Sequence, residues 1–288
     1  MKKFSLPRLT HIDDHEALDA YLMLALQEDG AWDDVTSKAV VPPSSMGRAK
    51  MFSKSEGVFC GGLIAKRIFE IMDDSLEISL KVKDGHYMKP GETLRTIKGS
   101  LRSILSAERT ALNFAQNRSG VATMTRKLVH AISKCKASVL DTRKTTPLWR
   151  ALERHAVLAG GGRNHRFALD DMIMIKNNHA DAVGGVGCAI RKARAHTPDL
   201  PLAAEARDFA EVEEAVEAGA DVIMLDNMTL EQIREAVRMI NHRALVEVTG
   251  GVTLRNIASL AHTGVDRISV GAITHSAPSM DIAMHLEP

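Results

Sequence analysis

Residues 218–226 read AGADVIMLD, and residues 263–271 read TGVDRISVG. In both stretches a glycine stands where a helix would end in the left-handed conformation. A short apolar run follows and stops at a polar or glycine residue. A helix that ends just before a buried strand is typical of parallel β/α architecture. This repeat therefore predicts strands of a parallel sheet or a β/α barrel.

The same alternation extends on both sides of the repeat. Short apolar runs separated by helical stretches occupy 137–141, 171–176, 200–205, 221–226, 244–249 and 267–271. Six strands are two fewer than a closed eight-stranded barrel has. Six could close only with help from other elements, so the pattern alone also allows an open sheet.

The first hundred residues have a different pattern. Helical spacing predicts helices over 12–28 and 65–72, whereas alternation and turn residues predict strands over 47–54, 76–82 and 94–97. Strands mixed with helices out of strict alternation indicate an α+β unit. A long helical pattern over 106–132 follows, in which Gly120 could mark a break.

Composition excludes several classes of protein. The chain has 288 residues, 45% of them hydrophobic, and 37 Lys+Arg against 36 Asp+Glu, which gives a net charge of +1. A near-neutral chain does not favour nucleic acid or an anionic membrane as a partner. The three cysteines are far apart, which argues against a zinc site or a disulfide framework. With no signal peptide or membrane span in the sequence, we expect a cytoplasmic protein.

Charged or glycine-rich residues follow each predicted strand. These tips are Asp141 to Lys144, Lys176, Glu205, Asp226, Thr249 to Gly251, and Gly271. In parallel β/α architectures the binding site lies at the carboxyl ends of the strands. We therefore expect a site there.

The residue types at these tips indicate the ligand. Glu205 and Asp226 suit Mg²⁺, which binds few protein carboxylates together with substrate phosphates, although two solvated acids would look the same. The glycines after Thr249 and at Gly271 would let backbone N–H groups approach a phosphate; plain tight turns are the alternative. Arg143, Lys144, Lys176 and the loop GGGRNHR at 160–166 concentrate cations. An arginine fork binds carboxylates well, although any one of these arginines could be a surface residue.

Several motifs in one order resemble the quinolinate phosphoribosyltransferase family. They are DTRKTTP at 141–147, GGGRNHR at 160–166, IKNNH at 175–179, LDNM at 225–228 and SVGAITHS at 269–276, with QED, DVTS and ERTALN in the first half. The resemblance implies an incomplete six-stranded β/α barrel over 116–275. It also implies an α/β sandwich domain over 1–115 that residues 276–288 join.

The resemblance further implies a reaction, partners and residue roles. Quinolinate and phosphoribosyl pyrophosphate would give nicotinate mononucleotide, pyrophosphate and carbon dioxide, with Mg²⁺, in de novo NAD biosynthesis. The protein would be at least a homodimer, with Arg109 donated to the partner's site. Arg143, His165 and Arg166 would hold the carboxylates, and Lys144 and Lys176 would lie between the substrates. Glu205 and Asp226 would face Mg²⁺ and the ribose, and Thr249, Gly250, Gly271 and His275 would bind the 5′-phosphate.

The chain departs from the family pattern at three places. Ala203 stands where the family has the first acid of Glu-x-Glu, Leu148 and Trp149 replace Gly-Leu, and Asn177 replaces an aspartate. We expect altered affinity from these changes. Two alternatives are a related molybdenum-operon pyrophosphorylase-like enzyme, whose pattern lacks the GGGRNHR and IKxNH strings, and a non-catalytic sensor of a phosphorylated nucleotide. The sensor would have no need for Lys144, Glu205 and Asp226 together.

Overall fold

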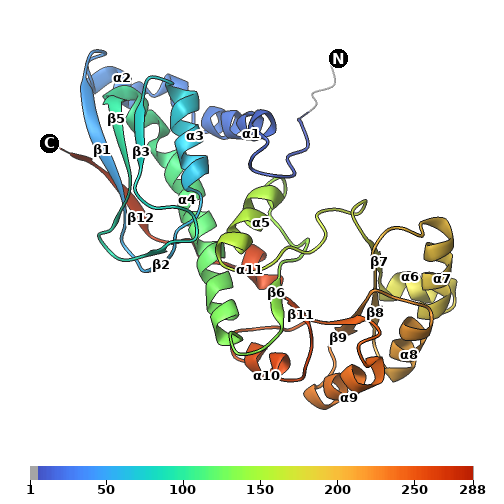
Figure 1. Cartoon of the computed structure of the whole chain (residues 1–288). Helices are drawn as coiled ribbons and strands as arrows, with labels where there is room; N and C mark the ends of the chain where they lie inside the picture. Colours follow the sequence, from blue (N-terminus) through green and yellow to red (C-terminus); the bar gives the residue numbers. More distant parts are fainter. Residues whose placement is uncertain (1–5, 288) are drawn as a thin grey trace, which may run out of the picture. The chain divides into compact units, whose positions relative to one another are not determined.

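The computed structural model describes residues 6–287 and divides the chain into two compact units. The first consists of Met1–Arg126, Thr146–Gly161 and Ser276–Pro288, and the second of Lys127–Thr145 and Gly162–His275. The division between the units falls at 126/127, within one continuous helix, α4 (Leu101–Ala131), which also contains the expected boundary at 115/116. The segment 146–161 was expected in the barrel domain, but it belongs to the first unit (Figure 1).

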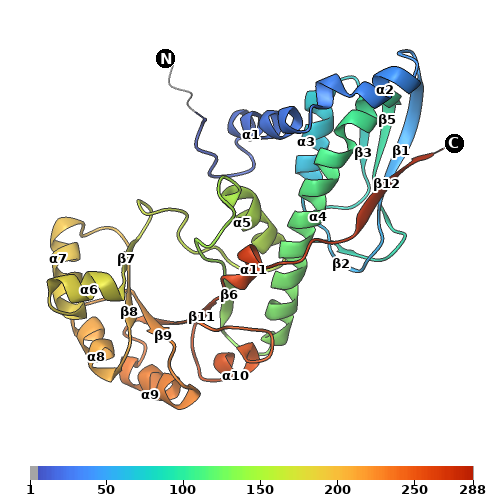
Figure 2. The ribbon, with the colours of Figure 1, turned by 180° about the vertical axis from the view of Figure 1, so that it is seen from behind.

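The first unit is built on an antiparallel sheet with strand order β12-β1-β5-β3. Its helices besides α4 are α1 (His15–Glu28), η1 (Ala31–Asp33), α2 (Val35–Val40), α3 (Gly62–Met72) and α5 (Arg150–Ala159). Its strands are β1 (Met46–Ser53), β2 (Gly57–Val58), β3 (Glu77–Leu80), β4 (Tyr87–Met88), β5 (Thr93–Ser100) and β12 (Ile282–Glu287). Figure 2 shows β12 along β1, at the edge of the sheet. The expected α+β unit is therefore confirmed.

Gly120 does not break α4, contrary to the sequence-based expectation. The helix continues on both sides of this residue. A side chain at this position would collide with the backbone carbonyl of Pro278, in the segment that leads to β12. Gly120 therefore serves close packing of two backbones.

The second unit contains a six-stranded, wholly parallel sheet. Its strands are β6 (Ser138–Leu140), β7 (Ile173–Ile175), β8 (Leu202–Ala206), β9 (Val222–Asp226), β10 (Leu245–Thr249) and β11 (Arg267–Ser269). The order is β6-β11-β10-β9-β8-β7. All six predicted strands are confirmed. The consecutive strands β6 and β7 lie at opposite ends of this order, so the sheet has the topology of an incomplete barrel.

Helices connect these strands, and local sequence explains where they begin and end. They are α6 (Asn177–Val183), α7 (Val186–His196), α8 (Phe209–Glu217), α9 (Leu230–Ile240), α10 (Ile257–Ala261) and α11 (Ala272–His275). Thr229 and Gln232 form a reciprocal capping box at the start of α9. Gly219 and Gly264, the glycines of the repeat, have φ of +81° and +95°. They supply the left-handed turn that the sequence predicts before β9 and β11.

Candidate active site

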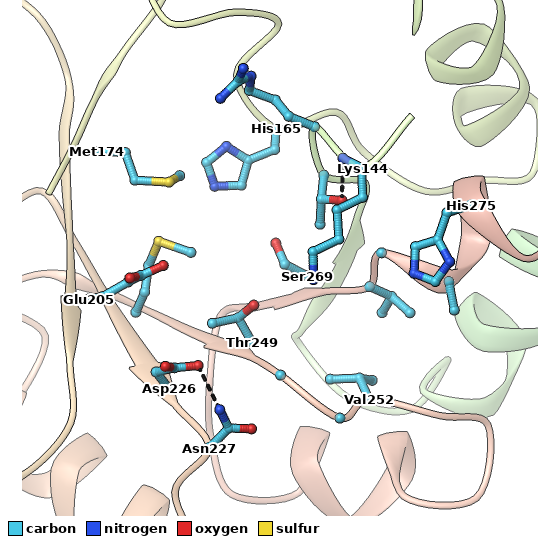
Figure 3. A pocket seen from close by; sticks show the side chains of 18 of the residues that line it. Lys144, His165, Met174, Glu205, Asp226, Asn227, Thr249, Val252, Ser269 and His275 are labelled. Carbon is cyan, nitrogen blue, oxygen red and sulfur yellow. Dashed lines mark hydrogen bonds between the residues drawn. The ribbon is translucent and has the colours of Figure 1, made fainter. Parts of the chain in front are cut away.

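A pocket of about 640 Å³ opens at the carboxyl ends of the parallel strands (Figure 3). All of its lining residues belong to the second unit. The predicted site residues that line it are Arg143, Lys144, His165, Arg166, Lys176, Glu205, Asp226, Thr249, Gly250, Gly271 and His275. Other lining residues include Thr142, Met174, Met224, Asn227, Val252 and Ser269. The sequence therefore predicted the location of the pocket and most of its charged residues.

Arg109 is the predicted site residue that the pocket does not include. It lies on α4 in the first unit, and its side chain is exposed. Its assignment to a partner's site therefore stays a prediction.

Two arginines of the pocket repel each other. Arg166 is buried, and burial lowers the pKa of its guanidinium; the positive charge of Arg143 lowers it further, whereas the carboxylates of Asp171 and Glu205 oppose the change. The Arg166 Nη1 group donates to the carbonyl of Met172 at 2.8 Å. Its Nε is a buried donor without a hydrogen-bond partner among residues 6–287. An anion that binds both guanidinium groups would relieve this repulsion.

Hydrogen bonds from buried groups hold the cationic segments in place. The carboxylate of Asp141, which is fully buried, accepts from the backbone N–H of His165 at 2.7 Å. The hydroxyl of Thr274, in α11, donates to the backbone carbonyl of Lys144 at 2.8 Å. The strand ends of β6 and the segment after β11 therefore fix the backbones from which Lys144 and Arg166 extend.

Two carboxylates enter the pocket from neighbouring strands. Glu205 of β8 binds Nζ of Lys176 at 2.6 Å and accepts from the backbone N–H of Asn177 at 3.3 Å. Asp226 at the end of β9 accepts from Nδ2 of Asn227 at 3.1 Å (Figure 3). Oxygen ligands from two carboxylates fit Mg²⁺, whose remaining ligands would be water and phosphate oxygens.

The two glycine tips differ in how soon a helix begins after them. Gly271 directly precedes α11, as expected, whereas the helix after Thr249–Gly251 begins only at Ile257. Gly250 has φ of +88°, and a Cβ there would lie 2.5 Å from Oδ1 of Asn227. A Cβ at Gly271 would lie 2.9 Å from Cδ of Lys144. The positive φ therefore favours glycine at Gly250, whereas a side chain at Gly271 would require Lys144 to move.

The three departures from the family pattern have distinct environments. Ala203 is fully buried in an apolar cluster with Val222 and Met224, against which Met172 and Met174 pack. Leu148 has φ of +68° and is 65% exposed, so a side chain stands in a backbone conformation that favours glycine. Oδ1 of Asn177 is buried without a hydrogen-bond partner in the described part of the chain.

Sequence reasoning missed the apolar and neutral part of the pocket. Met174 and Met224 lie on β7 and β9, whose apolar residues indicated only strands. Ser269 is the last residue of β11. It belongs to the SVGAITHS motif, but no role was predicted for it from the sequence. Met174 is two residues before Lys176, and Met224 is two before Asp226, so alternation along a strand could have placed both on the pocket face.

Comparison with known proteins extends over both units. Residues 34–119 match the quinolinate phosphoribosyl transferase N-terminal domain, and residues 121–285 match the C-terminal domain of the same family. A Bacillus subtilis protein described as a probable nicotinate-nucleotide pyrophosphorylase [carboxylating] is 39% identical over 274 residues, which are 94% of each chain. A mitochondrial quinolinate phosphoribosyltransferase [decarboxylating] of Nicotiana tabacum is 38% identical and covers 94% of this chain and 82% of its own.

A solved structure supports the same relationship. The crystal structure of NadC from Streptococcus pyogenes superposes with a TM-score of 0.91 at 40% sequence identity. The match covers 94% of this chain and 96% of that one. The sequence likeness and the structural likeness therefore extend over nearly the whole chain.

Proposed function

The chain belongs to the quinolinate phosphoribosyltransferase family, and from this premise we propose that its pocket binds quinolinate and phosphoribosyl pyrophosphate side by side. The family reaction joins the two substrates and gives nicotinate mononucleotide, pyrophosphate and carbon dioxide, a step of NAD biosynthesis. The observation that carries the assignment of the site is the convergence of four cationic side chains on one pocket, those of Arg143, Lys144, Arg166 and Lys176. The two guanidinium groups among them suit a dianionic pyridine dicarboxylate.

The two substrates occupy different sides of the pocket in this proposal. Arg143 and Arg166, with His165 beside them, bind the carboxylates of quinolinate. The glycine tips at Gly250 and Gly271 bind the 5′-phosphate through backbone N–H groups, with Thr249 and His275 next to them. Lys144 and Lys176 extend into the space between the two ends. The protein thereby holds two anions together that repel each other in solution.

The chemistry requires charge stabilisation at two positions. The pyridine nitrogen attacks C1 of the ribose as the bond to pyrophosphate breaks, and Lys144 and Lys176 stabilise the negative charge that leaves. The quaternary ring nitrogen then accepts electron density when the bond to the 2-carboxylate breaks. Carbon dioxide leaves, and a proton replaces it at ring carbon 2.

Mg²⁺ is part of the proposal. Glu205 and Asp226 would hold the ion together with oxygens of phosphoribosyl pyrophosphate. When bound, the ion supplies neutralisation of the pyrophosphate charge. The salt bridge between Glu205 and Lys176 meanwhile fixes the ammonium group at the pocket.

The finer assignments of assembly and location also belong to this proposal. Arg109 is exposed on α4 and would complete the site of a second copy. Mixing an Arg109→Ala variant with a Lys144→Ala variant, each inactive alone, would then restore part of the activity, because hybrid dimers contain one intact site.

Free cysteines at 60, 135 and 188 support a reducing compartment such as the cytoplasm. Among residues 6–287, no helix combines the length and the apolar character that crossing a membrane requires.

The decisive experiment measures products from quinolinate, phosphoribosyl pyrophosphate and Mg²⁺, with nicotinate in a parallel reaction. We expect nicotinate mononucleotide and carbon dioxide from quinolinate alone. Lys144→Ala removes a pocket cation and should abolish turnover, whereas Lys192→Ala, exposed on α7, should leave it unchanged.

Other results would contradict specific parts of the proposal. Turnover of nicotinate in place of quinolinate would retain phosphoribosyl transfer but overturn the substrate. Binding of phosphoribosyl pyrophosphate without turnover of either pyridine would favour the sensor interpretation.

A further inference from the structure

A carboxylate lies buried next to the pocket, outside the set of predicted site residues. Glu247 is in the middle of β10, between Met224 of β9 and Arg267 of β11 in the register of the sheet. Its side chain is fully buried and does not line the pocket. A charged group without water access needs partners inside the protein.

The partners of Glu247 are two residues that do line the pocket. The hydroxyl of Ser269 donates to Oε1 of Glu247 at 2.6 Å, and Nε2 of His165 lies 3.4 Å from the same oxygen, at ion-pair distance but without hydrogen-bond geometry. Oε2 of Glu247 has no hydrogen-bond partner within residues 6–287. The carboxylate therefore contacts two pocket-lining side chains, and one of its oxygens retains acceptor capacity.

The tautomer of His165 follows from its other ring nitrogen. Nδ1 accepts a hydrogen bond from the backbone N–H of Arg166 at 2.7 Å. A nitrogen that accepts in this way carries no hydrogen, so the ring hydrogen is on Nε2 and faces Glu247. The backbone N–H of Arg166 thus selects this tautomer, and the Nε2–H side of the ring lies 3.4 Å from Glu247.

The contact with Ser269 determines what that hydroxyl can bind. A serine hydroxyl has one hydrogen to donate, and a carboxylate can only accept. Because Ser269 donates to Glu247, its oxygen can only accept hydrogen bonds from a ligand in the pocket. A sugar hydroxyl is a suitable donor, whereas a phosphate or carboxylate oxygen is not.

We propose that Glu247 is a positioning residue for the reaction: its charge faces the Nε2–H side of His165, and it makes Ser269 an acceptor for a ribose hydroxyl. This inference rests on the proposed function, because it assigns the sugar of phosphoribosyl pyrophosphate to the wall formed by Ser269. Glu247 acts through these two side chains and does not touch substrate itself.

A double-mutant cycle tests the coupling. Glu247→Gln keeps the size of the side chain but can donate to Ser269, so we expect at least a tenfold loss in kcat/KM for phosphoribosyl pyrophosphate. Ser269→Ala should cause a comparable loss. The kcat/KM of the double variant should be little lower than that of either single variant, because each change alone already removes the hydrogen bond between Ser269 and Glu247. Glu214→Gln is the control, since this α8 carboxylate accepts from the backbone of Gly187 and does not line the pocket.

Nitrogen-15 NMR of the histidine rings measures the tautomer of His165 directly. A role of Glu247 in stability alone would not change these resonances. In the wild-type protein, His165, assigned with a His165→Asn variant, should show the Nε2–H tautomer. Glu247→Gln should shift its ring nitrogen resonances, while Glu214→Gln should leave them in place.

Three outcomes would overturn the inference. The first is a double variant whose loss equals the product of the two single losses. The second is a kcat/KM for Glu247→Gln within twofold of wild type. The third is a wild-type His165 with its ring hydrogen on Nδ1. The last needs no variant of Glu247 and can be measured even if Glu247→Gln does not fold. A wild-type protein inactive on quinolinate would defeat the proposed function, and the NMR result would still test the contact of Glu247 with His165.

Discussion

Two buried arginines, one in each unit, have opposite surroundings. Arg118 on α4 is fully buried, 3.6 Å from the carboxylate of Glu153, and its guanidinium lies 5.0 Å from the ring centre of Trp149. Burial lowers its pKa, and the charge of Glu153 opposes that change. Arg166 in the second unit is also buried, but its charged neighbour Arg143 lowers the pKa further.

The difference distinguishes charged side chains that stabilise the fold from charged side chains that bind a ligand. In the first unit the counter-charge is built into the chain, as it is again where His155 and the N–H groups of Gly61 and Gly62 surround Asp84. Arg166 in the pocket is influenced by the carboxylates of Asp171 and Glu205, but it is also repelled by Arg143, and its buried Nε has no hydrogen-bond partner within residues 6–287. A buried arginine therefore indicates a binding site when a like charge and an unsatisfied donor accompany its lowered pKa.

The largest expected effect concerns the pair in the first unit. Glu153→Ala leaves Arg118 buried without its carboxylate and should lower the free energy of unfolding by about 3–5 kcal/mol. Urea denaturation measures this loss. Replacing both residues, as Arg118→Met with Glu153→Leu, should recover most of it. A double variant as unstable as Glu153→Ala would show that the loss of stability does not come from the unpaired charge of Arg118.

The next effect concerns the pocket. Arg166→Met should reduce kcat/KM for quinolinate by about 10²–10³-fold, because a charge-assisted contact worth about 3–4 kcal/mol is lost. The same change removes a like-charge repulsion, so the urea midpoint should stay the same or rise. Arg191→Met, exposed on α7, is the matched control. A large fall in stability with Arg166→Met would show that this arginine supports the fold as Arg118 does.

A smaller effect tests backbone strain in the first unit. Leu148 has φ of +68°, so Leu148→Gly should raise the free energy of unfolding by about 1 kcal/mol, after the extra chain entropy of glycine is subtracted. Leu169 is similarly exposed but lacks a positive φ, so Leu169→Gly should not stabilise the protein. Equal effects in a thermal melt would contradict strain at Leu148.

The smallest effect is a dependence of stability on pH. The pKa of Asp34, which caps α2, is lowered to about 2, chiefly by the hydroxyl and then the backbone N–H of Ser37. A lowered pKa stabilises the fold above the unfolded-state value of about 4, and this contribution disappears as the pH falls from about 4 to 2. Asn can still cap the helix, so Asp34→Asn removes only the contribution of the charge and should cost at most about 1 kcal/mol at pH 7 and progressively less toward pH 2.

Asp33→Asn provides the control for this titration. Asp33 is 93% exposed and forms a surface ion pair with Lys38, so its replacement should change stability little at any pH. A difference between wild type and Asp34→Asn that persists at pH 2 would exclude the carboxylate as its source.

Sequence patterns were sufficient to predict the strands and the pocket of the second unit, because the residues that define them are close together in the sequence. Each strand is a short apolar run, each glycine cap is one residue, and the carboxyl ends of parallel strands gather Lys176, Glu205 and Asp226 at one edge. The role of Glu247 could not be predicted, because its partners Ser269 and His165 come from other segments of the chain. For the same reason the sequence did not predict that 146–161 joins the first unit or that Gly120 packs against Pro278.

The pairing of β12 with β1 has a consequence for synthesis on the ribosome. Met51 lies opposite Met284, so β1 has its second neighbour only after almost the whole chain has been translated. Until then β1 is an exposed edge strand that pairs with β5 alone. The second unit can be completed first, since its last residue precedes Ser276. The sheet of the first unit is therefore completed by a segment that follows the whole second unit in the sequence, and a chain without that segment would leave the edge of β1 open to other chains.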